Sequence, residues 1–194
     1  DKVKAEQFVL PIGKKKTHVI GINPSQITTE DLAVSLPPAA NYVPTDGYSK
    51  VAAVERHHNT GKIGVAVAKG YGIRNGAVAS SVSHDSHNII VVGTNETDMA
   101  AAVNRVVELN GGIVVWDGGQ SVAEVPLAIA GIMSDEPLVT VNEKLETAKD
   151  AAHKLGVNPG IDPFMTLSFM ALPVIPSLRI TTRGVFDVTT QSYV

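Results

Sequence analysis

The stretch from Gly76 to Asn95, GAVASSVSHDSHNIIVVGTN, constrains the fold more than any other part of this chain. Its two ends, Ala77 to Val82 and Ile89 to Val92, consist of small or β-branched residues that suit buried strands. Between them lies a run of polar residues, Ser83 to Asn88. Burying such residues without partners costs roughly 1–3 kcal/mol for each unsatisfied group. The run therefore either forms a closed hydrogen-bond network or faces a wet cavity, and it is the best candidate for a functional site.

Composition indicates one globular domain. The chain has 194 residues, 44% hydrophobic and 18% charged, which is enough for one sizeable core. A formal charge of −3 without a long Lys/Arg cluster argues against nucleic acid or an anionic membrane as a partner. The absence of cysteine excludes disulfides and fits a reducing cytoplasm. The N-terminus lacks the apolar core of a signal peptide, and because it begins with Asp1 instead of Met, we expect that a preceding segment was removed.

Short strand-like runs follow one another through the first half of the chain. They cover residues 17–23, 31–36, 48–56, 63–68, 77–82 and 89–92, with turn signals that include Asp46-Gly47 and Asn75-Gly76. Residues 8–12 are typical of an edge strand or a lead-in segment. Residues 113–116 and 120–129 predict a hairpin, and residues 178–180 and 185–188 predict further strands.

Two helices interrupt this pattern. Asn95 with Asp98 resembles a capping box, and apolar residues recur at helical spacing until about residue 109. A second helix, with Ser134 or Asp135 as its cap, carries one apolar stripe formed by Leu138, Val141, Leu145, Ala148, Ala152 and Leu155. The apolar run 164–178 contains two prolines and is too short to span a bilayer, so we expect it to be core or an interface.

The sequence thus predicts an α+β fold. We expect a mixed, largely antiparallel sheet, or two packed sheets, covered by helices near residues 98–109 and 136–155.

Several separated blocks carry a family resemblance. They are VERHHNTGKIGVAVAKGYGI from Val54, GAVASSVSHDSHNIIVVGTN from Gly76, the helix opening MSDEP at Met133, and DPFMTLSFMALPVIP from Asp162. Together they resemble the C-terminal domain of bacterial adenine deaminase, a hydrolase of adenine catabolism. The resemblance implies hydrolysis of adenine to hypoxanthine and ammonia by a metal-activated hydroxide, with manganese or iron held in an amidohydrolase barrel that precedes this domain. It also implies a homo-oligomeric, cytoplasmic enzyme.

The sequence departs from the whole enzyme in one respect. A barrel of this superfamily begins with a His-x-His metal pair, and none of the six histidines here forms one. The chain is also shorter than the roughly 250 residues of such a barrel. We therefore interpret it as the C-terminal domain without its barrel, and expect it to be inactive alone.

The polar run leaves several interpretations open. His84, Asp85 and His87 could ligate a metal only if a loop brought them together, because residues three apart lie on opposite faces of a strand. A Ser83-His84-Asp85 triad is disfavoured because neighbours in sequence diverge.

Under the hypothesis we favour, a polar loop points towards the barrel and closes or lines its active site. The candidate residues are His84, Asp85, Ser86, His87 and Asn88, together with Arg56, His57 and His58. The alternatives are a closed structural network, or a purely structural or oligomerisation module with its interface at residues 164–178.

Overall fold

The computed structural model describes residues 2–45 and 47–194. The turn expected at Asp46-Gly47 therefore lies partly outside the described residues. No helix within the described ranges is long and apolar enough to cross a membrane.

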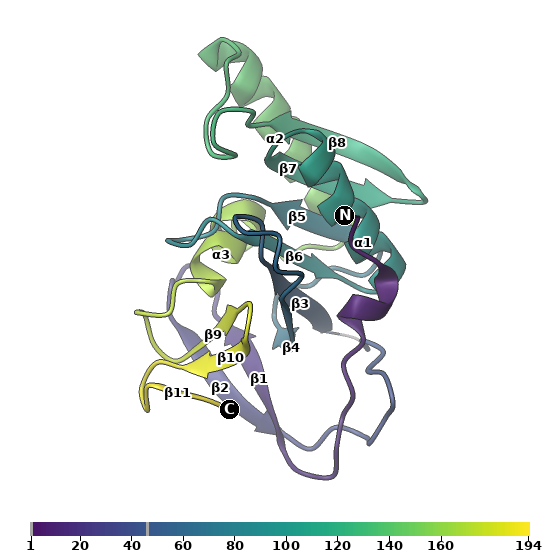
Figure 1. Ribbon diagram of the computed structural model, residues 1–194, viewed down its shortest axis with the longest axis vertical. Coiled ribbons are helices and arrows are strands. Elements are labelled where there is room, and N and C mark those ends of the chain that lie inside the picture. The colour runs from purple at the N-terminus through teal and green to yellow at the C-terminus, as the bar shows by residue number, and fades with distance from the viewer. Residues whose placement is uncertain (1, 46) are drawn as a thin grey trace.

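Within these ranges the chain forms an eight-stranded sheet, a three-stranded sheet and a few helices (Figure 1). The large sheet contains β1 (Thr17–Ile22), β2 (Thr29–Val34), β3 (Tyr48–Val54), β4 (Ile63–Lys69), β5 (Ala77–Ser80), β6 (Ile89–Gly93), β7 (Gly112–Asp117) and β8 (Gln120–Pro126). The small sheet contains β9 (Leu178–Thr181), β10 (Gly184–Asp187) and β11 (Ser192–Tyr193). The helices are the 3₁₀ turn η1 (Ala5–Phe8), α1 (Glu96–Glu108), α2 (Leu138–Lys154) and α3 (Pro163–Met170).

The strand order of the large sheet is β2-β1-β4-β3-β6-β5-β7-β8, and that of the small sheet is β11-β10-β9. Every neighbouring pair is antiparallel except β1 and β4, which are parallel. The predicted α+β class with a mixed, largely antiparallel sheet is therefore confirmed.

Both faces of the large sheet are covered, which explains why its central strands are apolar at nearly every position. Alternate residues of β3 enter different cores: Val51 and Ala53 pack with α2, α3 and β9, whereas Ala52 and Val54 pack with α1 and Phe8. Figure 1 shows α1 on one side of the sheet, with α3 and the small sheet on the other.

Both predicted helices are present, but the sequence predicted the N-terminal cap of α1 correctly and that of α2 wrongly. Asn95 caps α1 as expected, because its side chain accepts a hydrogen bond from Asp98 N. The expected cap of the second helix is wrong: α2 starts at Leu138, and the described residues give it no side-chain cap. Ser134 Oγ instead accepts from Glu136 N within the preceding turn, at 3.2 Å. Leu138 is 84% exposed, so the buried stripe of α2 begins only at the next turn.

For two other segments the sequence left two alternatives. Residues 8–12 contain the end of η1 and an isolated bridge from Ile12 to Ala39, so they form a lead-in segment and not an edge strand. The run 164–178 begins as helix α3, which Asp162 caps by accepting from Phe164 N and Met165 N. Phe164 is buried, so this run is core over much of its length.

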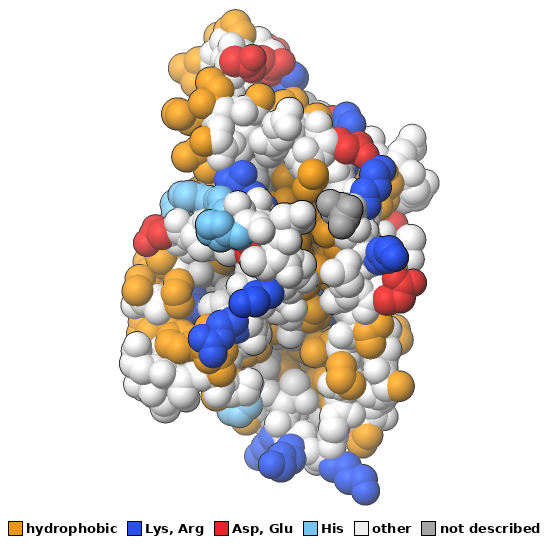
Figure 2. All heavy atoms as spheres, in the orientation of Figure 1, with side chains coloured by type: hydrophobic (Ala, Val, Ile, Leu, Met, Phe, Trp, Pro, Cys, Tyr) orange, Lys and Arg blue, Asp and Glu red, His pale blue; other side chains and the backbone are white. Residues whose placement is uncertain are grey.

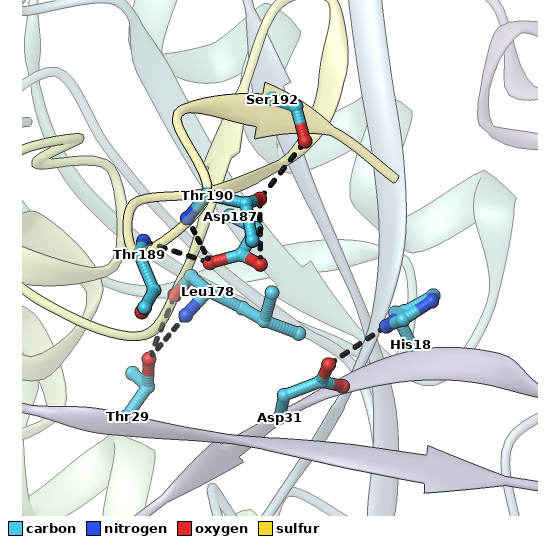
Figure 3. A network of polar contacts seen from close by, with 8 residues as sticks. All are labelled: His18, Thr29, Asp31, Leu178, Asp187, Thr189, Thr190 and Ser192. Carbon is cyan, nitrogen blue, oxygen red and sulfur yellow. Dashed lines mark hydrogen bonds and ion pairs between the residues drawn. The ribbon is translucent and has the colours of Figure 1, made fainter.

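Thr29 attaches the small sheet to the large one. Its Oγ1 donates to Leu178 O at 2.7 Å and accepts from Leu178 N at 3.1 Å, although 149 residues separate the two (Figure 3). On the same side, His18 Nδ1 lies 2.8 Å from Asp31 Oδ2, and Asp187 accepts from Thr190 Oγ1. The C-terminal segment is therefore part of the same folded unit as β2.

Candidate functional site

The polar run 83–88 is a loop between β5 and β6, neighbouring antiparallel strands of the large sheet. β6 also pairs with β3, and Val54 lies opposite Ile89. Because of this register, the residues that follow β3 lie beside the residues that precede β6. The two polar segments 55–60 and 83–88 therefore meet at one end of the central strands.

Hydrogen bonds join the two segments directly. Arg56 N donates to Asn88 Oδ1 at 3.4 Å, and Arg56 Nε donates to the His87 carbonyl. His57 Nε2 donates to the Ser86 carbonyl at 2.7 Å. The structure thus brings Arg56 and His57 against the candidate loop. His58 has an exposed side chain beside His57, with ring centroids 6.5 Å apart.

The two histidines of the loop lie over the end of α3. The His84 ring packs on Phe169 with centroids 5.0 Å apart, and His84 N donates to Ser168 O at 3.1 Å. The His87 ring lies 6.0 Å from the His84 ring, and His87 N donates to Ser83 O at 2.6 Å. His87 has φ 47, a left-handed conformation that a regular strand does not allow. The loop therefore turns, and both rings come to the same side.

The hydrogen-bond network beneath the loop is not closed. Ser83 Oγ, Ser168 Oγ and His87 Nδ1 are buried, and none of them has a hydrogen-bond partner among the described residues. Each such group costs roughly 1–3 kcal/mol when it remains unpaired. These atoms are inaccessible from the surface of the domain, so the groups of the two segments that can meet an outside partner are the exposed side chains of His57, His58 and Asp85.

The loop does not supply a metal site. Asp85 is 85% exposed, and its Oδ1 lies 3.9 Å from His84 Nδ1. In the part of the chain that the structure describes, no group of three or more His, Cys, Asp or Glu residues is arranged to hold a metal ion. His84, Asp85 and His87 therefore do not converge as ligands, and these three residues do not fit a metal ion. The Ser83-His84-Asp85 triad is likewise not formed, because Ser83 Oγ has no described partner.

Burial, together with the neighbouring charged groups, favours the neutral form of His87. Burial lowers the pKa of its imidazole, the nearby His84 and Arg56 lower it further, and Asp85 partly opposes them. Burial also lowers the pKa of Arg56. Among the described residues, no carboxylate lies within 4.0 Å of the Arg56 guanidinium. At neutral pH the site thus combines an uncharged imidazole with an arginine that has no acidic partner among the described residues.

Glu55 organises the segment that carries His57, and sequence reasoning missed it. Its carboxylate accepts hydrogen bonds from the backbone N of His57, His58 and Thr60 and from Thr60 Oγ1. Burial raises the pKa of Glu55, but these hydrogen bonds outweigh it and lower the pKa to about 2. An acidic residue directly before the polar turn RHHNTG was the available signal.

Sequence reasoning also missed the contacts that come from distant parts of the chain. Ser168 and Phe169 support the loop from α3, and Ala130 accepts a hydrogen bond from Arg56 Nη2 at 2.7 Å. Gly131 lies under the same guanidinium: a Cβ there would come within 2.7 Å of Arg56 Nη1. A local sequence pattern cannot predict these contacts, because they join residues far apart in the chain: more than 70 residues separate Arg56 from Ala130.

The fold and the site define a class: an α+β domain that presents a polar histidine loop without a metal-ligand set of its own among the described residues. The family model described as adenine deaminase C-terminal domain matches residues 26–192. The chain belongs to this family.

Curated relatives support the assignment. The chain is 46% identical to adenine deaminase of Nitratidesulfovibrio vulgaris (strain DP4) over 189 residues, which cover 96% of this chain and 33% of the relative. It is 44% identical to adenine deaminase of Bacillus subtilis (strain 168), covering 94% of this chain and 32% of the relative. It is 47% identical to adenine deaminase of Brucella anthropi, covering all of this chain and 35% of the relative. The chain thus spans about a third of the length of the relatives it matches.

Proposed function

We propose that this domain is the accessory C-terminal part of a metal-dependent adenine deaminase, which converts adenine and water to hypoxanthine and ammonia. In this enzyme the loop 83–88, with Arg56 and His57, closes or lines the active site of an amidohydrolase barrel in the same polypeptide. The names of the relatives and the share of their length outside this chain support the assignment.

One observation carries the role of the loop: segments 55–60 and 83–88 meet at one end of the central strands and present the exposed side chains of His57, His58 and Asp85 there. Polar side chains on loops that a rigid sheet positions are where binding and catalytic sites are often built. A barrel docked over this end would bring its active site against them.

The residues of this domain act by orientation and proton placement. Manganese or iron, bound by the barrel, would supply the acidity that generates hydroxide from water. The Nε2 atom of the neutral His87 and the Nη1 atom of Arg56, which the hydrogen bonds to His87 O and Ala130 O do not use, are suited to hydrogen-bond the purine edge or the attacking water. We further propose a cytoplasmic homo-oligomer as the assembled enzyme.

Substitution of the loop histidines in the full-length enzyme tests this proposal. We expect His84→Ala and His87→Ala each to lower kcat for adenine by about tenfold or more, as removal of a group that orients catalytic partners does. Thermal stability and the assembled mass should stay close to wild type. The pH profile of kcat should change in His87→Ala, which a merely structural role would not cause.

His18→Ala is the matched control. His18 lies on β1 in an exposed pair with Asp31, and such pairs contribute about 0–1 kcal/mol. Its kinetics should equal wild type. Wild-type kinetics in the His84 and His87 variants would reject the loop proposal and leave the domain with the structural role.

A further inference from the structure

An exposed apolar surface lies beside residues 83–88, which we call the histidine loop. We define it as the end surface, formed by Ile129, Ile132, Met133, Leu138 and Val139. Five of the fourteen large hydrophobic side chains exposed in the described residues thus fall in one stretch, 129–139, which links β8 to the first turn of α2. Leu138 and Val139 are 84% and 69% exposed. Figure 2 shows hydrophobic side chains gathered over this end of the molecule, directly above a group of histidines.

The fold of this domain does not account for these side chains. The face of α2 that packs on the sheet uses Val141, Leu145, Ala148 and Ala152, so Leu138 and Val139 are not needed for the core. The stretch is nevertheless held in a defined shape. Ile129 N donates to Met133 O, and Met133 N donates to Ile129 O. Clusters of exposed apolar residues on an ordered surface typically mark interaction sites.

Arg56 joins the end surface to the histidine loop. Its guanidinium donates to His87 O in the loop and to Ala130 O in the stretch 129–139. Ser81 Oγ adds a second link by donating to Gly131 O at 2.6 Å. The two features are therefore parts of one continuous face, and a body seated over the loop also reaches the end surface.

We infer that the end surface is the docking face for the part of the polypeptide that lies outside this chain, the barrel of the proposed function. The relatives are about three times as long as this chain, so in the proposed enzyme the rest of the polypeptide is large enough to cover the face. Continuity with the histidine loop favours this occupant over a second copy of the domain. The inference rests on the proposed function and specifies which surface of the domain meets the barrel.

Methionine oxidation in the full-length enzyme tests the inference, because oxidation by peroxide follows the exposure of the sulfur. Met133 and Met165 are 54% and 47% exposed in this domain, whereas Met99 and Met170 are buried. The rate for each methionine is measured by mass spectrometry in the native enzyme and in the same enzyme unfolded in urea. We expect Met133 to be protected to the same degree as Met99. Oxidation of Met133 near its unfolded rate would overturn the inference.

Two further measurements separate the alternatives. Loss of Met133 protection when the enzyme is diluted until its subunits separate would assign the surface to a second copy and overturn the inference. The double variant Leu138→Ser, Val139→Ser should expose Met133 to oxidation without unfolding the enzyme. Val122→Ser, at another exposed apolar position on β8, is the control and should leave Met133 protected.

The outcomes also distinguish this inference from the proposed function. A reactive Met133 together with impaired His84 and His87 variants would reject the end surface as the docking face but support the active-site role of the loop. A protected Met133 together with wild-type kinetics in those variants would support the docking face but reject the active-site role of the loop.

Discussion

His87 shows how strongly one residue here depends on its surroundings. Its ring is only partly exposed and its Nδ1 is buried without a described partner; burial lowers its pKa most, and the neighbouring Arg56 guanidinium lowers it further. The folded protein therefore favours the neutral imidazole. Because its pKa is lowered on folding, His87 reduces stability as the pH falls below the unfolded value of 6.5 and through the folded value.

A titration of His87 by NMR checks this account. We expect its pKa to lie below 6.5, and Arg56→Gln to raise it towards that value because a neighbouring positive charge is removed. Arg74→Gln changes an exposed arginine that does not affect His87, and should leave the titration unchanged. A His87 pKa at or above 6.5 in the unmodified chain would contradict the account.

The members of the candidate loop could be predicted from sequence, but their geometry could not. Six polar residues between two apolar runs are visible in the sequence, and so is the polar cluster after residue 54. The left-handed conformation of His87 and the burial of Ser83 depend on α3, which packs under the loop from more than 80 positions later in the chain. Such contacts are decided by tertiary packing, which local patterns do not encode.

At the scale of secondary-structure elements, the sequence predicted the features that depend on residues close together in the chain. The strands up to β10 and both long helices follow from hydrophobic patterns, whereas the two-residue β11 was not predicted; the Asn95 cap follows from the spacing of Asn95 and Asp98. The start of α2 was misplaced because Ser134 is used inside the preceding turn. Helix α3 was not predicted because its residues are apolar on all sides, so they show no helical periodicity. The parallel pairing of β1 with β4 joins strands that are not consecutive in the chain, so local sequence patterns do not predict it.

The contact between the two sheets depends on Gly64. A Cβ on Gly64 would lie 2.0 Å from Thr181 O and 2.5 Å from Gly184 N, and these backbone atoms cannot rotate away. We expect Gly64→Ala to lower the free energy of unfolding by about 2 kcal/mol, within the usual range for overpacking. Urea unfolding measures the change. Gly13→Ala is the control, because open space surrounds Gly13, and equal stability of the two variants would refute the packing argument.

At the scale of the whole molecule, Lys50 ties together three distant segments. Its Nζ is fully buried and donates to Asn41 Oδ1 at 2.6 Å, to Phe8 O at 3.4 Å and to Glu96 Oε1. Burial raises the pKa of Glu96, but the hydrogen bonds from Lys50 and Asn41 outweigh it, so the pKa lies below the ordinary value of 4.5. Glu96 therefore contributes stability that is present above pH 4.5 and is lost as the pH falls through its folded pKa.

Without Lys50, the ionised carboxylate of Glu96 should destabilise the folded protein instead of stabilising it. We expect Lys50→Met to lower the free energy of unfolding by about 3 kcal/mol at pH 7, because the substitution leaves a largely buried carboxylate without its cation. The cost should shrink at pH 4, since Glu96 without Lys50 becomes protonated more easily. Urea unfolding at both pH values provides the test. Lys2→Met, in an exposed pair with Glu108, should change stability by less than about 1 kcal/mol. A loss in Lys50→Met that is equal at both pH values would argue against the ion pair.

The bond between Thr29 and Leu178 sets an order of events in the cell. A ribosome delivers the chain from its N-terminus, so β1 and β2 leave the exit tunnel long before residue 178 has been made. During that interval the hydroxyl of Thr29 and the edge of β2 have no native partner from the small sheet. This edge of the large sheet is therefore completed late, and the nascent domain stays open on this side until residue 178 has left the ribosome.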